Sequence, residues 1–126
     1  LTEIPGSSSV IEGGFVTYSN QAKISMLSVK LEQLDQYGAV SEEVARSMAE
    51  GALRRSKADI AIACTGVAGP GGATNTKPVG LVHLACASKT HPPTHKQCNF
   101  SGDRSTIRMA TVNAAFGLIE AQLSII

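Results

Sequence analysis

Residues 59–80 read DIAIACTGVAGPGGATNTKPVG, and this stretch decides the fold class. It begins with a short apolar run at residues 60–64 and continues as a loop rich in glycine and proline. A short apolar run between a charged residue and a glycine loop is typical of a strand that is buried on both faces. Such strands lie in parallel or mixed sheets with helices on both sides. Ligands of these sheets bind beyond the carboxyl ends of the strands, so residues 65–78 are a candidate binding-site wall.

The rest of the chain supplies further strands and helices for such a sheet. Strands are predicted at residues 15–18, 80–87 and 95–100, and the last two are close enough to form an antiparallel hairpin. Helices are predicted at residues 21–27, 31–37, 42–56 and 104–123. We therefore expect an α/β fold: a three-layer α/β/α domain around a mixed central sheet of at least four strands.

Capping residues support these helix boundaries. Ser19 or Asn20 can cap the first helix, and Ser41 can cap the third. Gly38 follows the second helix where a left-handed cap is favourable, and Gly51 inside the third helix, where it costs helix propensity, indicates a tight approach. The last helix has two apolar lines, which predict burial on two sides: Ile107, Ala110, Ala114, Leu118 and Ala121, then Phe116, Ile119 and Leu123.

Length and composition exclude several classes of protein. The 126 residues fit one domain, and 43% apolar with 17% charged residues is the composition of a globular chain. The net charge is +1 and no basic face interleaved with aromatic residues occurs, so nucleic acid is not an expected partner. No stretch is apolar for the length of a membrane span and no signal peptide is recognisable, which predicts a cytoplasmic protein without a membrane partner.

Cysteine and histidine spacing argues against a metal site. The chain has three cysteines, Cys64, Cys86 and Cys98, without a C-x-x-C pair, so we interpret them as free, mostly buried thiols. His91 and His95 are separated by two prolines and cannot share a helix face, and His83 is interpreted as a sheet-face histidine. A phosphate-transfer enzyme would need a Mg²⁺ site, but the clustered acidic residues lie on predicted helices.

The glycine loop itself matches no phosphate-binding motif. It lacks G-x-x-x-x-G-K-[ST] and G-x-G-x-x-G, and Lys77 is followed by Pro78 with no helix starting there. The alternative interpretation is a long structural connection. Against that alternative, loops of this length are uncommon unless they have a function.

The segment at residues 7–23 contains hydroxyl groups followed by a lysine. A serine attacks an acyl centre only when a base removes its proton, and a lysine can be that base if burial lowers its pKa. Tyr18, at the predicted strand end, and Lys23, in the first turn of the next helix, can point into one pocket. The alternative is that the serines form turns and caps while Lys23 is solvated.

Four motifs in order resemble a known family. PGSSSVIEGGFVTYSNQAK, GAVSEEVARSMAEGAL, ADIAIACTGVAGPGG with KPVGLVHLA, and GDR before the last helix are similar to the CinA C-terminal domain, the nicotinamide-nucleotide amidase (NMN deamidase) family. The resemblance covers residues 1–119. It implies hydrolysis of the carboxamide of nicotinamide mononucleotide to nicotinate mononucleotide and ammonia, without metal or cofactor, in bacterial pyridine nucleotide salvage.

The resemblance also implies roles for individual residues. Ser8 would be the nucleophile, with Ser7 and Ser9 as alternatives, Lys23 the general base and Tyr18 its proton-relay or orienting partner. The candidates for substrate contacts are Ser7, Asn20, Thr65, Gly66, Ala68, Gly69 and Arg104. Backbone N–H groups near Thr65 would serve as oxyanion or substrate donors, and Arg104 would meet a phosphate. The family resemblance further implies a homo-oligomer.

The chain departs from the family pattern at its start. Family members carry an A-E-S-C-T-G-G-like segment upstream, and residues 1–4 here resemble the tail of a helix that Pro5 and Gly6 stop. We therefore expect residues 1–126 to be a single CinA C-terminal-like domain lacking an N-terminal strand and part of its first helix. The alternative function is a non-catalytic module that binds a nucleotide or a protein.

Overall fold

Three strands form the central layer of the molecule. In the computed structural model, which describes all of residues 1–126, they are β1 (Ile60–Gly66), β2 (Leu81–Ser88) and β3 (Thr94–Asn99). The sheet order is β1-β2-β3, and both pairs are antiparallel. The central strand β2 is buried at every residue. The predicted hairpin of β2 and β3 is therefore confirmed.

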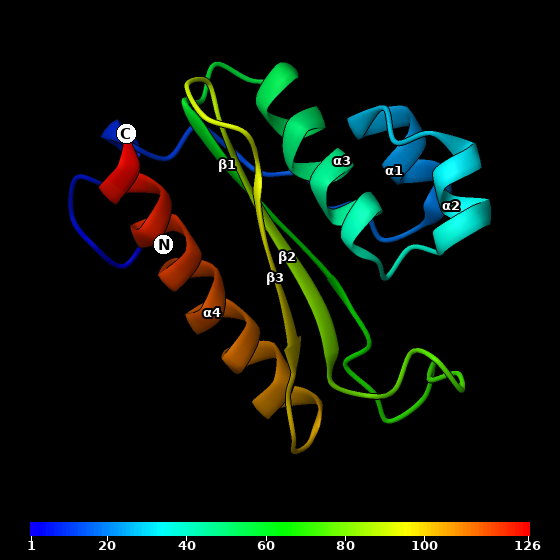
Figure 1. The fold of residues 1–126 in the computed structure, drawn as a ribbon. Coiled ribbons are helices and arrows are strands. Elements are labelled where there is room, and N and C mark those ends of the chain that lie inside the picture. Colours follow the sequence, from blue (N-terminus) through cyan, green and yellow to red (C-terminus); the bar gives the residue numbers. More distant parts are fainter.

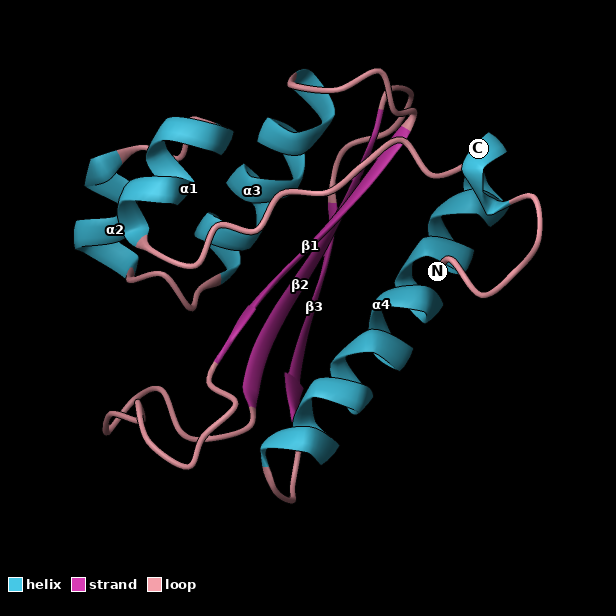
Figure 2. Ribbon diagram, turned by 180° about the vertical axis from the view of Figure 1, so that it is seen from behind, coloured by secondary structure: helices cyan, strands magenta, loops and turns pink.

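Helices cover both faces of this sheet (Figures 1 and 2). α3 (Glu42–Arg54) lies on one face, with α1 (Asn20–Leu27) and α2 (Leu31–Tyr37) on its outer side, and α4 (Arg104–Ile125) lies on the other face. A single 3₁₀ turn, η1 (Ser7–Ser9), precedes them. The predicted α/β class with three layers is confirmed. No helix combines the length and apolarity that a membrane span requires.

Each layer boundary has its own apolar core. Between α3 and the sheet, small residues allow close packing: Ala45, Ala49, Ala63, Ala85 and Ala87 are all buried. Between the sheet and α4, the core contains Val82, Leu84, Cys98, Ile107 and Ala115. Two cores explain why the strands are apolar on both faces.

The two predicted serine caps form as the sequence indicates, whereas Gly38 ends α2 with φ 79° and ψ 164°, outside the left-handed helical conformation that was predicted. The Ser19 hydroxyl accepts a hydrogen bond from Ala22 N at 3.0 Å, and the Ser41 hydroxyl accepts from Val44 N at 3.3 Å. α3 ends two residues earlier than predicted, at Arg54. A Cβ at Gly51 would collide with the Leu27 backbone carbonyl, so the predicted close approach is that of α1 to α3.

Two predictions about the sheet are wrong. It has three strands and is antiparallel throughout, where we expected at least four strands in a mixed sheet. Burial on both faces follows from the covering helices, so it does not report strand direction. Residues 15–18 form no strand, because residues 12–18 make no backbone–backbone hydrogen bond with any neighbour. Their high β propensity is not sufficient without a partner strand. Figure 2 shows this segment crossing from the side of α4 to α1.

The predicted burial of α4 is correct for only one side. Ile107 is buried, but Ala121 is exposed and the neighbouring Gln122 is buried in its place. In the second apolar line, Phe116 and Leu123 are exposed. α4 therefore covers the sheet with one face and presents apolar side chains on another.

Candidate functional site

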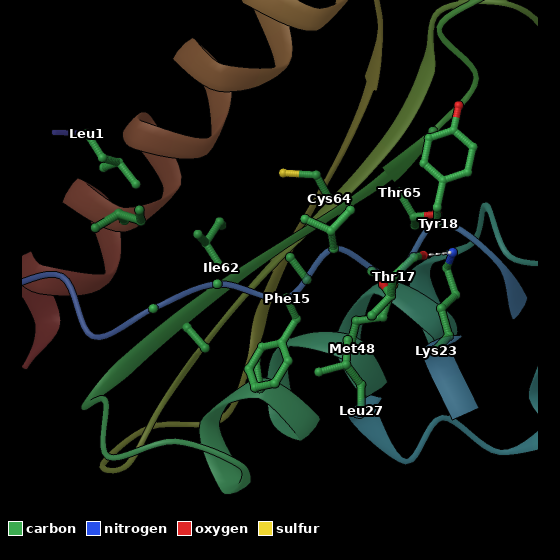
Figure 3. A pocket seen from close by; sticks show the side chains of 18 of the residues that line it. Leu1, Phe15, Thr17, Tyr18, Lys23, Leu27, Met48, Ile62, Cys64 and Thr65 are labelled. Carbon is green, nitrogen blue, oxygen red and sulfur yellow. Dashed lines mark hydrogen bonds between the residues drawn. The ribbon is translucent and has the colours of Figure 1, made fainter. Parts of the chain in front are cut away.

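A groove of about 1420 Å³ runs between the extended segment at residues 10–18 and β1. Most of its lining is apolar, and it continues past the carboxyl end of β1 to the glycine loop. Figure 3 shows Phe15, Leu27 and Met48 together on the α3 side of the groove. The groove therefore joins the glycine loop to the segment that contains Tyr18 and Lys23.

Lys23 is the charged side chain buried in this groove. It lies in the first turn of α1 and is only 6% exposed. Its Nζ donates a hydrogen bond to the Thr17 carbonyl at 2.8 Å, and no carboxylate is paired with it. Burial therefore lowers the pKa of Lys23 from its usual value. A lysine with a lowered pKa has a larger neutral fraction, which is the form that can accept a proton.

Tyr18 lines the same end of the groove but does not contact Lys23 through its hydroxyl. The residue is 86% exposed, and its phenol makes no hydrogen bond within the chain. Figure 3 shows the ring extending away from the Lys23 ammonium. The two side chains share a pocket as predicted, while the relay role of Tyr18 stays a prediction.

The predicted wall residues of the glycine loop gather along the groove. Thr65, Gly66, Ala68, Gly69 and Arg104 all line it. The buried Thr65 hydroxyl donates to the Ala39 carbonyl at 2.8 Å, and Arg104 Nη1 donates to the Gly69 carbonyl at 2.8 Å. These bonds join the loop to the connection between α2 and α3 on one side and to α4 on the other.

A further anchor of the loop was not predicted. Lys77 Nζ donates to the Tyr37 carbonyl at 3.1 Å and also to the Val40 carbonyl. The carbonyl of Tyr37 ends α2, where the helix dipole favours a cation. No sequence pattern indicates this contact, because its acceptors are backbone carbonyls nearly forty residues away.

The serines do not join this group. Ser8 is exposed in η1 and does not line the groove, and neither do Ser7, Ser9 or Asn20. Figure 1 shows the N-terminal turn beside the C-terminal end of α4, across the molecule from α1. The eight residues at 11–18 that follow this turn would span roughly 26 Å if fully extended at about 3.3 Å per residue. The structure thus brings Lys23, Tyr18 and Thr65 together and leaves Ser8 apart.

The cysteines offer no ready nucleophile in its place. All three are free thiols. Cys86 and Cys98 are buried as expected, whereas Cys64 is exposed. Desolvation by the surrounding protein still raises the pKa of both Cys64 and Cys86 to about 11, so their thiolate fractions at neutral pH are small. No group of three or more His, Cys, Asp or Glu side chains is arranged to hold a metal ion.

The fold and the groove define a class: a three-layer α/β domain with a buried lysine at one end of an apolar groove. The family model of the CinA C-terminal domain matches residues 1–123, and the chain belongs to that family.

Individual relatives agree with this assignment. A CinA-like protein of Endomicrobium trichonymphae is 48% identical over 98% of the chain. The chain spans about 30% of the length of the curated relatives it matches.

Solved structures give the same result. The competence/damage inducible protein CihA from Agrobacterium tumefaciens has a TM-score of 0.93 at 50% identity, covering 95% of this chain and 73% of that one. A CinA superfamily protein from Escherichia coli has a TM-score of 0.80 at 40% identity, covering 84% and 61%.

Proposed function

We propose that the protein containing this domain hydrolyses the carboxamide of nicotinamide mononucleotide, giving nicotinate mononucleotide and ammonia. The observation that carries the proposal is Lys23, a buried lysine with a lowered pKa and no acidic partner, at the wall that Thr65 and Gly66 form. An amidase with a serine nucleophile needs a base of this kind to remove the hydroxyl proton. The reaction would belong to pyridine nucleotide salvage in the bacterial cytoplasm and would use no metal or cofactor.

In the proposed reaction the neutral Lys23 amine accepts the proton of a serine hydroxyl as its oxygen attacks the carboxamide carbon. The C–N bond then breaks, and Lys23 returns the proton to the leaving nitrogen, which departs as ammonia. Water hydrolyses the resulting ester with Lys23 again as the base. Tyr18 would orient or relay the proton, and loop N–H groups near Thr65 would stabilise the oxyanion.

Arg104 is proposed to contact the phosphate of the substrate. Its Nη1 already donates to the Gly69 carbonyl, which holds the guanidinium at the loop, and it has no carboxylate partner. Arg104→Met should therefore raise KM for the mononucleotide much more than for nicotinamide riboside, which lacks the phosphate. An equal effect on both substrates would contradict the phosphate contact.

The base assignment is tested by ammonia release from nicotinamide mononucleotide with the full-length protein. Lys23→Arg keeps a cation but cannot supply a neutral amine, because arginine does not lose its proton in proteins. We expect turnover to fall by about 100-fold or more in Lys23→Arg and Lys23→Met, and to persist in the exposed control Lys30→Met. Wild-type turnover in Lys23→Met would overturn the assignment.

The nucleophile needs a separate test, because Ser8 lies outside the groove and its assignment rests on sequence resemblance. If Ser8 is the nucleophile, Ser8→Ala abolishes ammonia release while folding is kept, and the neighbouring Ser9→Ala remains active. Full turnover in Ser8→Ala would remove Ser8 from the mechanism and leave Lys23 to activate another hydroxyl.

One observation favours a second function. The groove is mostly apolar and Ser8 is remote from Lys23, which is also compatible with a non-catalytic module that binds a nucleotide or a protein. Such a module would be stabilised against heat by nicotinamide mononucleotide without releasing ammonia. Ammonia release that depends on Lys23 would exclude this non-catalytic function.

A further inference from the structure

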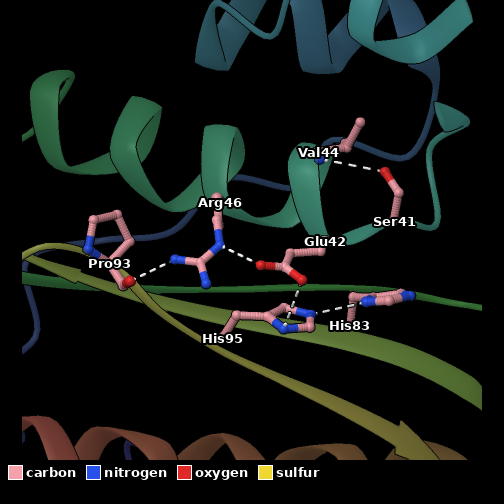
Figure 4. A network of polar contacts seen from close by, with 7 residues as sticks. All are labelled: Ser41, Glu42, Val44, Arg46, His83, Pro93 and His95. Atoms are coloured by element: carbon pink, nitrogen blue, oxygen red, sulfur yellow. Dashed lines mark hydrogen bonds and ion pairs between the residues drawn. The ribbon is translucent and has the colours of Figure 1, made fainter. Parts of the chain in front are cut away.

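Two histidines make direct contact on the sheet face beneath α3 (Figure 4). His83 comes from β2 and is only 7% exposed, and His95 comes from β3. Their rings are stacked, with centroids 5.1 Å apart and planes 24° apart. His83 Nδ1 and His95 Nε2 are 2.9 Å apart, which is a hydrogen-bond distance.

This contact has room for a single hydrogen. With both rings neutral, His83 Nδ1–H donates to His95 Nε2, and His95 Nδ1–H faces Glu42 Oε1 at 3.5 Å. A first added proton leaves one donor and one acceptor at the contact, so the bond survives. A second proton places an N–H on both facing nitrogens and two positive charges on stacked rings, so the bond is lost.

The groups around the pair connect it to α3 and the glycine loop. Glu42 accepts a hydrogen bond from Arg46 Nε at 2.8 Å, and Arg46 Nη1 donates to the Pro93 carbonyl beside β3 (Figure 4). The charge of Glu43 in α3 also acts on both rings, and the charge of Lys77 in the loop acts on His83. The two glutamates favour a charged ring, while Arg46 and Lys77 oppose it.

We propose that His83 and His95 form an acid-sensitive latch between β2 and β3, beneath the first turn of α3, that opens when the pair takes up its second proton. The turn of α3 above it continues directly into the α2–α3 connection, whose Val40 lines the groove and accepts from Lys77. This device is independent of the proposed reaction.

The sign of the pH dependence follows from the surroundings. Burial, the largest cause, lowers the pKa of both His83 and His95 below the value of about 6.5 that they have in the unfolded chain. Below about pH 6.5 the unfolded state therefore binds more protons than the folded state, and stability is lost as the pH falls. The latch is closed above this range.

Ring ¹⁵N NMR of the wild-type chain tests the latch without any variant. We expect His83 to be protonated on Nδ1 and His95 to have an unprotonated Nε2 at neutral pH. Both should titrate below the value of about 6.5 that a histidine has in an unfolded chain. Exchange of the amides that pair β2 with β3 around His95 should accelerate over the same range. Titration of the pair at or above about pH 6.5, or unchanged exchange of these amides, would overturn the proposal.

Variants give a second, independent measurement. The unfolding equilibrium constant of wild type should rise on acidification by roughly tenfold for each unit by which a histidine pKa is lowered. His95→Gln removes one titrating ring and should reduce that rise, while the control His91→Gln should keep it in full. A wild-type acid response in His95→Gln contradicts the latch.

Discussion

At the scale of single residues, buried polar groups set the chemistry of this domain. The ammonium of Lys23 has one backbone carbonyl as its partner, so the charged form is only partly compensated for its loss of water. Gln122 is 1% exposed between α4 and the sheet, and both its amide nitrogen and its amide oxygen are hydrogen-bonded. Substitution of Lys23 and of Gln122 should therefore change the stability of the domain in different ways.

Lys23 should make the stability of the domain depend on alkaline pH. Because its folded pKa is lowered, the unfolded chain holds a proton that the folded chain has released, up to about pH 10.4. The free energy of unfolding of wild type should therefore rise relative to Lys23→Met as the pH increases toward that value. Urea unfolding from neutral to alkaline pH measures the difference. Parallel curves for the two proteins would contradict the lowered pKa, and Lys30→Met should follow wild type.

Truncation of the Gln122 side chain should destabilise the folded domain. Its Nε2 donates to the Ser88 hydroxyl at 3.0 Å and its Oε1 accepts from Thr94 at 3.2 Å, so it joins the last turns of α4 to both β2 and β3. Gln122→Ala removes both hydrogen bonds from a buried site and should lower the free energy of unfolding by about 2 kcal/mol. Chemical denaturation checks this against Gln36→Ala, an exposed helical control that should change little. Equal effects of the two changes would contradict the bridging role.

At the scale of elements, the contact of α1 with α3 determines which glycines are replaceable. Gly51 has the Leu27 backbone against it, whereas Gly117 in α4 has no atom within 4 Å of an added Cβ. Helix propensity favours alanine at both positions, so any difference between them must come from packing.

Alanine at these two glycines should change stability in opposite directions. Gly51→Ala forces α1 away from α3 and should destabilise the chain by about 1–3 kcal/mol. Gly117→Ala should stabilise it by about 0.5–1 kcal/mol, because it only removes backbone freedom from the unfolded state. Thermal unfolding of the two variants measures both. A stabilising Gly51→Ala would show that α1 does not pack as closely as described.

At the scale of the whole molecule, apolar side chains on α4 remain uncovered. The α4 stripe, defined by Met109, Val112, Phe116 and Leu123, is exposed along one side of the helix. Its spacing of three, four and seven residues places these side chains on one face. Exposed apolar stripes of this kind mark interaction surfaces.

We therefore predict that the chain self-associates through the α4 stripe. Sedimentation velocity should show a concentration-dependent increase in mass for wild type, and the double variant Met109→Glu/Phe116→Glu should remain monomeric at the same concentrations. Asn113→Glu adds a charge on the exposed surface of α4 beside the stripe and should behave as wild type. Monomeric wild type, or association that survives the double variant, would contradict the prediction.

Local signals were sufficient for much of this molecule. The serine caps, the helical periodicity and the glycine after Tyr37 act within one or two turns, so α1, α2 and the start of α3 follow from the sequence. The order of four motifs likewise identified the family, and the glycine loop was predicted as the wall of a groove. The caps, the periodic stretches and each single motif depend on residues close together in the chain.

The tertiary structure alone decided the rest. The antiparallel direction of β1, the unpaired state of residues 15–18 and the distance between Ser8 and Lys23 depend on how far-separated segments meet. The contact of His83 with His95 also requires two strands in register. Propensity and periodicity report the neighbourhood of each residue, whereas pairing and burial depend on partners elsewhere in the chain. For that reason the sequence determined which residues could serve this site, and only the fold determined which of them meet.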